Sequence, residues 1–331
     1  MDFERPLLTF AIPTYNRAEY LEGLLEFLLK ELRDECRVEV IVSDNASTDR
    51  TGTLVSTFQS RGLAIRYLRN SENIGPDGNI LQCFMQAAGK YVWVFSDDDI
   101  LRSDTFGRIL NLLGRQLYDL ICIRAYFFEG EYQQHKEFTP ASDLICESAE
   151  DLARHFHVFF TFISGVIVNK DLVSSSDHRP FESLLDSNLA QLGPIYTALN
   201  RQRSSLLIRD PLIAARGNST LGYAMYRVFG PSLYRITTEW IEKQSVQRAI
   251  INGTIQMFFP FFLLRAREAQ ISTVEENPHE VLRPCHGKNF RYWVFNYPIY
   301  ALPIPFAKIW LLIIRMMNKA DALLGGPIVR S

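Results

Sequence analysis

The sequence has little of what marks a secreted, zinc-binding or nucleic-acid-binding protein. Its 331 residues contain five cysteines, an odd number with no CxxC spacing, at Cys36, Cys83, Cys122, Cys146 and Cys285. This pattern predicts reduced thiols in a cytoplasmic protein and argues against a structural zinc site. The formal net charge of −2 provides no overall field that would attract nucleic acid, so we expect no nucleic-acid partner.

Targeting and dinucleotide-binding segments are also lacking. The N-terminal residues MDFERP carry acidic side chains where a signal peptide has basic ones. The apolar run at residues 258–264 is too short to span a bilayer and contains Pro260. No GxGxxG motif follows an early expected strand, which argues against a dehydrogenase.

What is present is the alternation typical of an α/β protein. The first hundred residues alternate short β-rich runs with helical patterns, which predicts a mostly parallel, Rossmann-like sheet flanked by helices. Expected strands cover residues 7–12, 38–42, 64–68, 91–95, 120–126, 163–168 and 206–214. Expected helices cover residues 18–32, 51–58, 77–88, 104–113 and 151–160, with a polar loop at 129–147. Beyond residue 218 the chain changes to long, aromatic-rich helical segments.

Polar clusters follow the first four expected strands, at residues 13–17, 43–49, 70–75 and 97–99. Ligands of open parallel sheets bind at the carboxyl ends of the strands, where loop side chains and helix N-termini converge. Any one cluster is explained by turns and helix caps. Four in succession favour a ligand site at this edge.

Three adjacent carboxylates, Asp97, Asp98 and Asp99, are the sharpest of these features. They repel one another and need a cation, basic partners or free solvent. Since they follow the apolar run YVWVF, a buried strand brings them to the ligand edge, where Mg²⁺ or Mn²⁺ accepts carboxylate and phosphate oxygens. We predict a metal-diphosphate site, with a solvated turn as the alternative.

Two further side chains have a binding and a structural interpretation. Asp44, which follows the second strand, could accept a hydrogen bond from a base or a ribose hydroxyl, or cap its own turn. Arg17 could pair with phosphate through its planar guanidinium, or lie exposed in the first turn of a helix.

Four segments, IPTYNRAEYL, VIVSDNASTDRT, RNSENIGPDGN and GKYVWVFSDDDIL, resemble in order and spacing the family 2 glycosyltransferases of GT-A fold. The resemblance covers roughly the first hundred residues well and is strongest to the abequosyltransferase-like branch of bacterial O-antigen and capsule assembly. It implies inverting, metal-dependent transfer of a hexose or deoxyhexose from a nucleotide-diphosphate sugar to a glycan or polyprenyl-linked acceptor. A sugar-nucleotide-binding or scaffold protein without turnover, and a sugar nucleotidyltransferase, remain the alternatives.

The resemblance also assigns roles to particular residues. It places a group near the nucleotide, with Asp44 facing the base: Pro13, Thr14, Asn16, Arg17, Asp44, Asn73 and Gly75. Asp97 and Asp98 match the acidic motif, and Asp98 is the expected ligand of a divalent cation, Mg²⁺ or Mn²⁺. Many members have an Asp-x-Asp-Asp motif, and Ser96 occupies the position of its first Asp. The resemblance therefore does not assign the ribose contact to one of Asp97 and Asp98 and the metal contact to the other.

An inverting transfer needs a carboxylate that takes the proton from the attacking hydroxyl. In the family this base lies in an acidic motif at a helix start, which corresponds here to residues 179–189. Asp186 is the predicted base and Glu182 the second candidate. Asp186 could instead cap the helical segment at residues 189–199.

The implied organisation is a GT-A domain at residues 1–218 and a helical C-terminal region at 219–331. Residues 1–100 would bind the nucleotide sugar and 101–218 the acceptor. At 305–324, an apolar segment places Lys308, Arg315 and Lys319 on one helical face, which favours a helix lying in a membrane surface. Packing in a core or an oligomer is the alternative. We expect a cytoplasmic protein, peripheral on the inner face of the cytoplasmic membrane.

Overall fold

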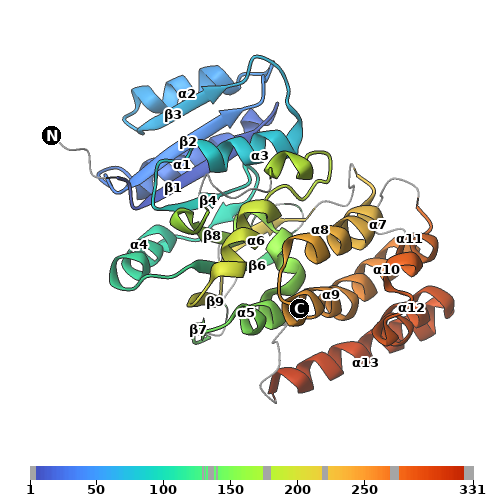
Figure 1. Cartoon of the computed structure of the whole chain (residues 1–331). Helices are drawn as coiled ribbons and strands as arrows, with labels where there is room; N and C mark the ends of the chain where they lie inside the picture. Colours follow the sequence, from blue (N-terminus) through green and yellow to red (C-terminus); the bar gives the residue numbers. More distant parts are fainter. Residues whose placement is uncertain are drawn as a thin grey trace. The chain divides into compact units, whose positions relative to one another are not determined.

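The computed structural model describes residues 5–128, 130, 132, 138, 141–173, 180–217, 223–268 and 276–323. The chain forms two compact units. The first comprises Met1–Glu147 and Phe160–Gly217, and the second comprises Ser148–Phe159 and Asn218–Ser331. The described part of the first unit is a mixed sheet with helices on both faces, and that of the second is helical (Figure 1).

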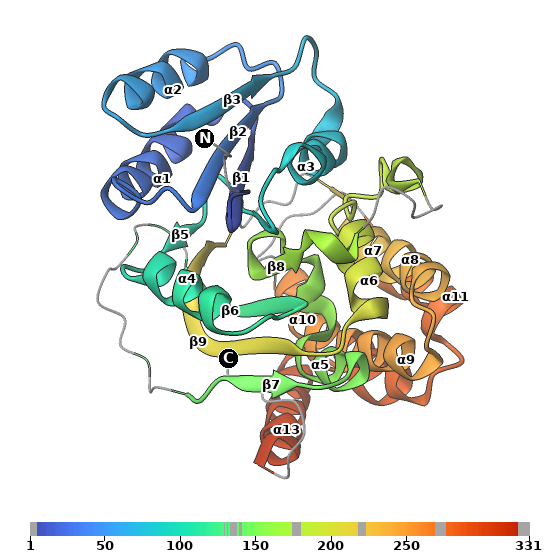
Figure 2. The same ribbon diagram turned by 60° about the vertical axis from the view of Figure 1, so that its left-hand side comes forward.

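The sheet of the first unit has the strand order β3-β2-β1-β4-β8-β6-β9-β5, with β7 paired to β9. Its strands are β1 Leu8–Thr14, β2 Val38–Asp44, β3 Ile65–Arg69, β4 Tyr91–Val94, β5 Ile100–Leu101, β6 Leu120–Phe128, β7 Leu144–Cys146, β8 Val166–Asn169 and β9 Ser205–Arg216. The first four strands are parallel, and Figure 2 shows β3, β2 and β1 side by side. Their carboxyl ends therefore meet at one edge.

Helices cover both faces of this sheet. The bounds are α1 Ala18–Glu31, α2 Thr51–Ser60, α3 Gly75–Gln86, α4 Thr105–Arg115 and α6 Leu192–Arg201. The leucines of α1 are buried against the same core as the aromatic side chains Phe10, Trp93, Phe95 and Phe106. The ring centroids of Phe10 lie 5.0–5.2 Å from those of the other three, within the range of favourable aromatic pairs. This core supports β1 and β4 rigidly beneath their polar ends.

The second unit is built from helices around its own apolar core. The helices are α5 Ala149–Phe156, α7 Met225–Arg227, α8 Leu233–Trp240, α9 Gln244–Gly253, α10 Phe259–Arg267, α11 Pro278–His286, α12 Tyr297–Ala301 and α13 Ile304–Leu323. Three π-helical turns connect some of them: η5 Val228–Ser232, η6 Thr254–Phe258 and η7 Tyr292–Asn296. The core includes Phe259, Tyr292 and Ile299.

The run at residues 258–264 is part of a longer helix, because α9, η6 and α10 continue into one another. The resulting helix, Gln244–Arg267, has 24 residues and is long and apolar enough to cross a membrane. Buried helices of soluble proteins meet the same criterion, and 39% of its most apolar window is buried. Its length and composition are therefore weak evidence for a membrane span.

The expected α/β class and the helical C-terminal region are confirmed. The structure differs in detail at residues 163–168, where a 3₁₀ turn, Ile163–Gly165, precedes β8. β8 also runs antiparallel to β4 and β6. An apolar run predicts a buried strand but not its direction, which depends on where the preceding connection enters the sheet. The capping role considered for Asp186 is wrong, since α6 begins at Leu192 with Gln191 as N-cap.

Candidate functional site

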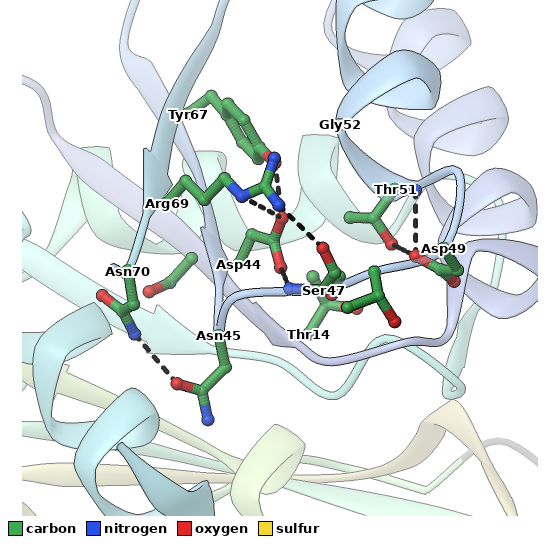
Figure 3. Close-up of polar contacts among 12 residues, drawn as sticks. Thr14, Asp44, Asn45, Ser47, Asp49, Thr51, Gly52, Tyr67, Arg69 and Asn70 are labelled. Carbon is green, nitrogen blue, oxygen red and sulfur yellow. Dashed lines mark hydrogen bonds and ion pairs between the residues drawn. The ribbon is translucent and has the colours of Figure 1, made fainter. Parts of the chain in front are cut away.

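The polar clusters expected at the strand ends do converge at one edge of the sheet. The register aligns Thr14 with Asp44 and Asp44 with Arg69, so β1, β2 and β3 end together. Figure 3 shows these residues with Asn45 and Asn70 in the loops beyond the strands. The edge is thus crowded with hydrogen-bonding side chains.

Asp44 is the last residue of β2, and its side chain is fully buried at this edge of the sheet. Its Oδ2 accepts a hydrogen bond from the Tyr67 hydroxyl at 2.5 Å, and its Oδ1 accepts one from the Ser47 backbone N at 2.8 Å. Burial, together with Asp44, raises the pKa of Tyr67 well above its ordinary value. The turn-capping role is therefore present, and both oxygens already accept hydrogen bonds. Arg69 Nε lies 4.0 Å from the same carboxylate.

An asparagine network holds the loop at residues 70–75. The Asn45 amide nitrogen donates to Asn73 Oδ1 at 2.7 Å and to the Gly75 carbonyl at 3.1 Å. The Asn45 oxygen accepts from Ile74 N and Asn70 Nδ2. Gly75 has φ +77°, a left-handed conformation that favours glycine. The predicted residues Asn73 and Gly75 are thereby fixed beside the end of β2.

Asn16 ties the loop after β1 to the loop after β2. Its Oδ1 accepts from the backbone N of Thr48 at 2.7 Å, and its own backbone N donates to Ser47 Oγ at 2.9 Å. Pro13, one residue before Thr14 in β1, pairs with Ser43 of β2. These contacts link the two loops that precede α1 and α2.

The acidic cluster is organised by one arginine. Arg17 Nη1 lies 3.0 Å from Asp97 Oδ1, and Arg17 Nη2 donates to Asp98 Oδ2. Thr14 Oγ1 donates to the other oxygen of Asp97 at 2.7 Å, and Ser96 Oγ donates to Asp98 Oδ1 at 2.6 Å. Asp97 is 2% exposed and Asp98 10%, whereas Arg17 is 36% exposed. Three side chains, those of Arg17, Thr14 and Ser96, thus surround two nearly buried carboxylates.

This geometry fits a divalent cation. Both carboxylates already converge on one positive group, the Arg17 guanidinium, and hard carboxylate oxygens are the ligands that Mg²⁺ and Mn²⁺ prefer. Burial raises the pKa of Asp97 to about 6, although Arg17 and Thr14 act to lower it. A cation would favour the ionised form of such a buried carboxyl group.

Asp99 has a different role from its two neighbours. Its carboxylate accepts from Ser164 Oγ at 2.6 Å and from the backbone N of Arg216 at 3.2 Å. Ser164 Oγ also accepts from Ser96 N at 2.9 Å. Burial raises the pKa of Asp99 to about 7, while Ser164 lowers it. Asp99 and Ser164 therefore connect the end of β4 to β9 and shape the turn; sequence reasoning missed Ser164 because it lies in an apolar run.

Asp186 lies in an exposed loop with φ +64°, between the 3₁₀ turn Phe181–Leu184, which carries Glu182, and α6. The described structure gives it no hydrogen bond or ion pair with Asp97 or Asp98. Its loop is anchored by Asp77 of α3, whose carboxylate accepts from the backbone N of Asn188 at 2.8 Å and of Ala190 at 3.2 Å.

Asp77 was missed as a functional candidate. The sequence feature that could have identified it is its place in the segment NIGPDGN, two residues after Gly75. Burial raises the pKa of Asp77, and the charge of Asp186 adds to this effect, while the backbone hydrogen bonds lower it. The loop that carries Asp186 is therefore joined to the segment that carries Asn73 and Gly75.

Comparison with known proteins points to one family. Residues 9–174 match the family described as Glycosyl transferase family 2. The chain is 40% identical over 226 residues to the abequosyltransferase RfbV of Salmonella typhimurium. This alignment covers 64% of this chain and 67% of RfbV. It is 33% identical over 106 residues to the GalNAc(5)-diNAcBac-PP-undecaprenol β-1,3-glucosyltransferase of Campylobacter jejuni, covering 32% of this chain and 34% of that one.

Solved structures show the same fold. Residues 1–349 of Staphylococcus aureus TarS, in complex with UDP, superpose with a TM-score of 0.61 at 16% identity, covering 96% of this chain and 91% of that 1–349 chain. The mannosyltransferase PcManGT of Pyrobaculum calidifontis, in complex with GDP-Man and Mn²⁺, superposes with a TM-score of 0.56 at 16% identity, covering 96% and 88%. The GT-A architecture expected from the sequence is confirmed.

Proposed function

Because this chain belongs to glycosyl transferase family 2, and is thus a glycosyltransferase of polysaccharide synthesis, we propose that it performs an inverting, metal-dependent transfer in the synthesis of a bacterial surface polysaccharide. The donor is a nucleoside-diphosphate hexose or deoxyhexose, and the acceptor is a hydroxyl of a glycan or of a polyprenyl-linked sugar. The observation that carries this proposal is the convergence of Asp97 and Asp98 on the Arg17 guanidinium at the sheet edge.

Asp98 and Asp97 would hold Mg²⁺ or Mn²⁺, whose charge stabilises the departing diphosphate when the cation is bound. Arg17 then exchanges its carboxylate partners for phosphate oxygens, which its planar guanidinium can contact in pairs. Its 36% exposure supports such an exchange, while its contact with the Tyr20 ring, 4.9 Å from the ring centroid, holds it near the start of α1. Thr14 continues to orient Asp97 through its hydroxyl.

The nucleoside part of the donor is assigned to the corner between β1, β2 and the loop at residues 70–75. Pro13, Asn16, Asn73 and Gly75 form its walls through the backbone positions described above. Asp44 supports this corner from below, because its oxygens hold Ser47 and Tyr67. Because the Tyr67 hydroxyl donates to Asp44 Oδ2, this hydrogen bond must break before Asp44 can contact the base through that oxygen.

Asp186 is the proposed general base, with Glu182 as the second candidate. Both are exposed, as a group that must reach an incoming acceptor needs to be. Asp77 is a positioning residue in this scheme, since its two backbone hydrogen bonds hold the loop that follows Asp186. Such positioning matters because a small misplacement of a base lowers the rate strongly.

The proposal is tested by thermal unfolding with UDP-, GDP-, CDP- and dTDP-sugars, each with and without Mg²⁺ or Mn²⁺. One donor is expected to raise the melting temperature only when the cation is present, because binding stabilises the folded state by mass action. The same donor is then tested for transfer to lipid-linked and soluble glycans. Absence of cation-dependent stabilisation by every donor contradicts the donor site, while stabilisation without transfer supports a binding protein without turnover.

We further propose that α13 lies in a membrane surface, on the inner face of the cytoplasmic membrane. Its buried face contains Ala307, Leu311 and Ile314. Six other large apolar side chains of the helix are exposed: Phe306, Ile309, Leu312, Ile313, Met316 and Met317. An apolar face of this extent, beside Lys308, Arg315 and Lys319, suits the boundary between lipid headgroups and acyl chains. Lys308 is already paired with Glu268 at 2.5 Å, so apolar burial is the larger expected contribution.

A further inference from the structure

The second unit contains a cavity of about 480 Å³ that none of the residues assigned to the sheet edge line. Three arginines line it, Arg154 from α5, Arg248 from α9 and Arg291 from the residue before η7, against one carboxylate, that of Glu150. Apart from His157, the lining has three positive charges and one negative charge, a balance of +2. A volume of this size lies in the range of small-molecule sites.

A network of amide side chains holds one of these arginines. Arg291 Nη1 donates to Gln256 Oε1, and Gln256 Nε2 donates at 2.7 Å to Asn318 Oδ1, a buried group of α13. Asn252, which also lines the cavity, accepts at 2.8 Å from Asn289 through its Oδ1. Its NH₂ group is left as a donor. Supporting contacts of this kind preorganise a binding site.

One wall of the cavity has a strained backbone. His157, which is fully buried, has φ +35° and ψ −114°, an unusual backbone conformation for a residue other than glycine. Gly253 makes room for it, because a Cβ at Gly253 would lie 2.4 Å from His157 Cβ. The next residues of this wall, Gln256 and Met257, lie in the π-helical turn η6. Strained residues and π turns both cluster at functional sites.

We propose that this cavity is a second ligand site, which binds a diphosphate group. Three guanidinium groups against one carboxylate favour a ligand with more than one negative charge, and a guanidinium contacts two phosphate oxygens at once. The diphosphate could belong to a free anion or to a lipid carrier, and both present the same oxygens. The inference uses only residues of the second unit and does not depend on the sheet-edge assignments.

The test is isothermal titration of the full chain with inorganic pyrophosphate, and in detergent with farnesyl diphosphate, in EDTA so that a cation site makes no contribution. The variants Arg248→Gln and Arg291→Gln are expected to lose affinity about tenfold or more each, the loss typical of a hydrogen bond to a charged group. Arg235→Gln serves as the matched control. Arg235 is exposed on α8, pairs with Glu239 and does not line the cavity, so this variant should bind as the unaltered protein does.

Tighter binding of farnesyl diphosphate than of pyrophosphate identifies a lipid-linked ligand, and equal binding identifies the free anion. Melting temperatures of all variants establish that they are folded. The proposal is overturned if neither ligand binds at millimolar concentration, or if the combined variant Arg154→Gln/Arg248→Gln/Arg291→Gln binds as tightly as Arg235→Gln.

Discussion

At the scale of single residues, the acidic cluster divides into two functions. Asp97 and Asp98 converge on Arg17, whereas Asp99 accepts hydrogen bonds from Ser164 and Arg216. Three adjacent carboxylates therefore coexist because one basic side chain neutralises two of them and burial favours the protonated form of Asp99. Adjacent positions in a sequence need not share a role, because the turn at Asp97 and Asp98 directs these side chains to other partners than that of Asp99.

Replacement of Asp98 by Asn is expected to remove cation-dependent donor stabilisation and to lower the transfer rate by roughly 100-fold or more, the scale on which charge stabilisation at a reacting group acts. The measurements are thermal unfolding with donor and cation, and initial transfer rates. Asp171→Asn is the control, since Asp171 is half exposed and pairs only with Arg5 among the described contacts of its side chain. Equal rates for the two variants would remove Asp98 from the cation site.

The proposed base and its anchor are separable by kinetics. Asp186→Asn is expected to abolish transfer while donor binding stays intact, because the amide cannot accept the acceptor's proton. Asp77→Asn replaces one of two acceptor oxygens with a donor, so one backbone N–H of the Asp186 loop loses its partner. We expect kcat to fall about tenfold or more with an unchanged donor KM. Near-normal kcat in Asp186→Asn would transfer the role to Glu182.

At the scale of elements, α13 presents two apolar faces. One face packs in the core of the second unit, and truncation before this helix would expose that core. Substitution of the outer face is therefore the sharper experiment. Two residues of the predicted basic face have contacts within the second unit: Lys308 is paired with Glu268, and the Arg315 guanidinium lies 6.0 Å from the centroid of the Phe261 ring.

The variant Phe306→Ser/Ile309→Ser/Met316→Ser is expected to reduce sedimentation with vesicles of anionic phospholipid by tenfold or more, since each side chain loses apolar area buried in the interface. The melting temperature should change little, because all three side chains are exposed. Leu117→Ser, at an exposed position of the first unit, is the control. Unchanged sedimentation of the triple variant would assign the outer face of α13 to a protein contact.

At the scale of the whole molecule, a buried histidine couples folding to pH. His286 lies in the second unit near the rings of Tyr234 and Phe259, and burial lowers its pKa from 6.5 to about 4. Between these values the unfolded chain binds a proton that the folded chain does not. The stabilisation is thus fully present above about pH 6.5 and is lost as the pH falls toward 4.

His286→Phe is expected to lack this component of the pH dependence. The free energy of unfolding of the unaltered protein should fall by about 3 kcal/mol more than that of the variant between pH 7 and pH 4, which is the pKa difference multiplied by 1.36 kcal/mol per unit. Urea unfolding of both proteins at pH 7.0, 5.5 and 4.0 measures the difference. Parallel pH profiles would show that His286 is accessible to protons in the folded state.

Much of the fold follows from local patterns. The strand and helix positions of the first hundred residues agree with expectation to within a few residues, as for α1 at Ala18–Glu31 and β2 at Val38–Asp44. The direction of β8 and the joining of α9 to α10 did not follow from local patterns. Strand direction depends on the path of the chain between elements, and periodicity within an element contains no information about that path.

The family, the order of the polar clusters and the acidic cluster proposed to hold a cation follow from residue types at the ends of strands, so they could be predicted without the structure. Which of these side chains contact one another depends on the tertiary structure. Arg17 reaches Asp97 and Asp98 across 80 and 81 positions, and Asp77 anchors Asn188 across 111. Such pairs arise because parallel strands and their loops bring distant segments of the chain to one edge of the sheet. The contacts depend on strand order and register, which neighbouring residues in the sequence do not specify.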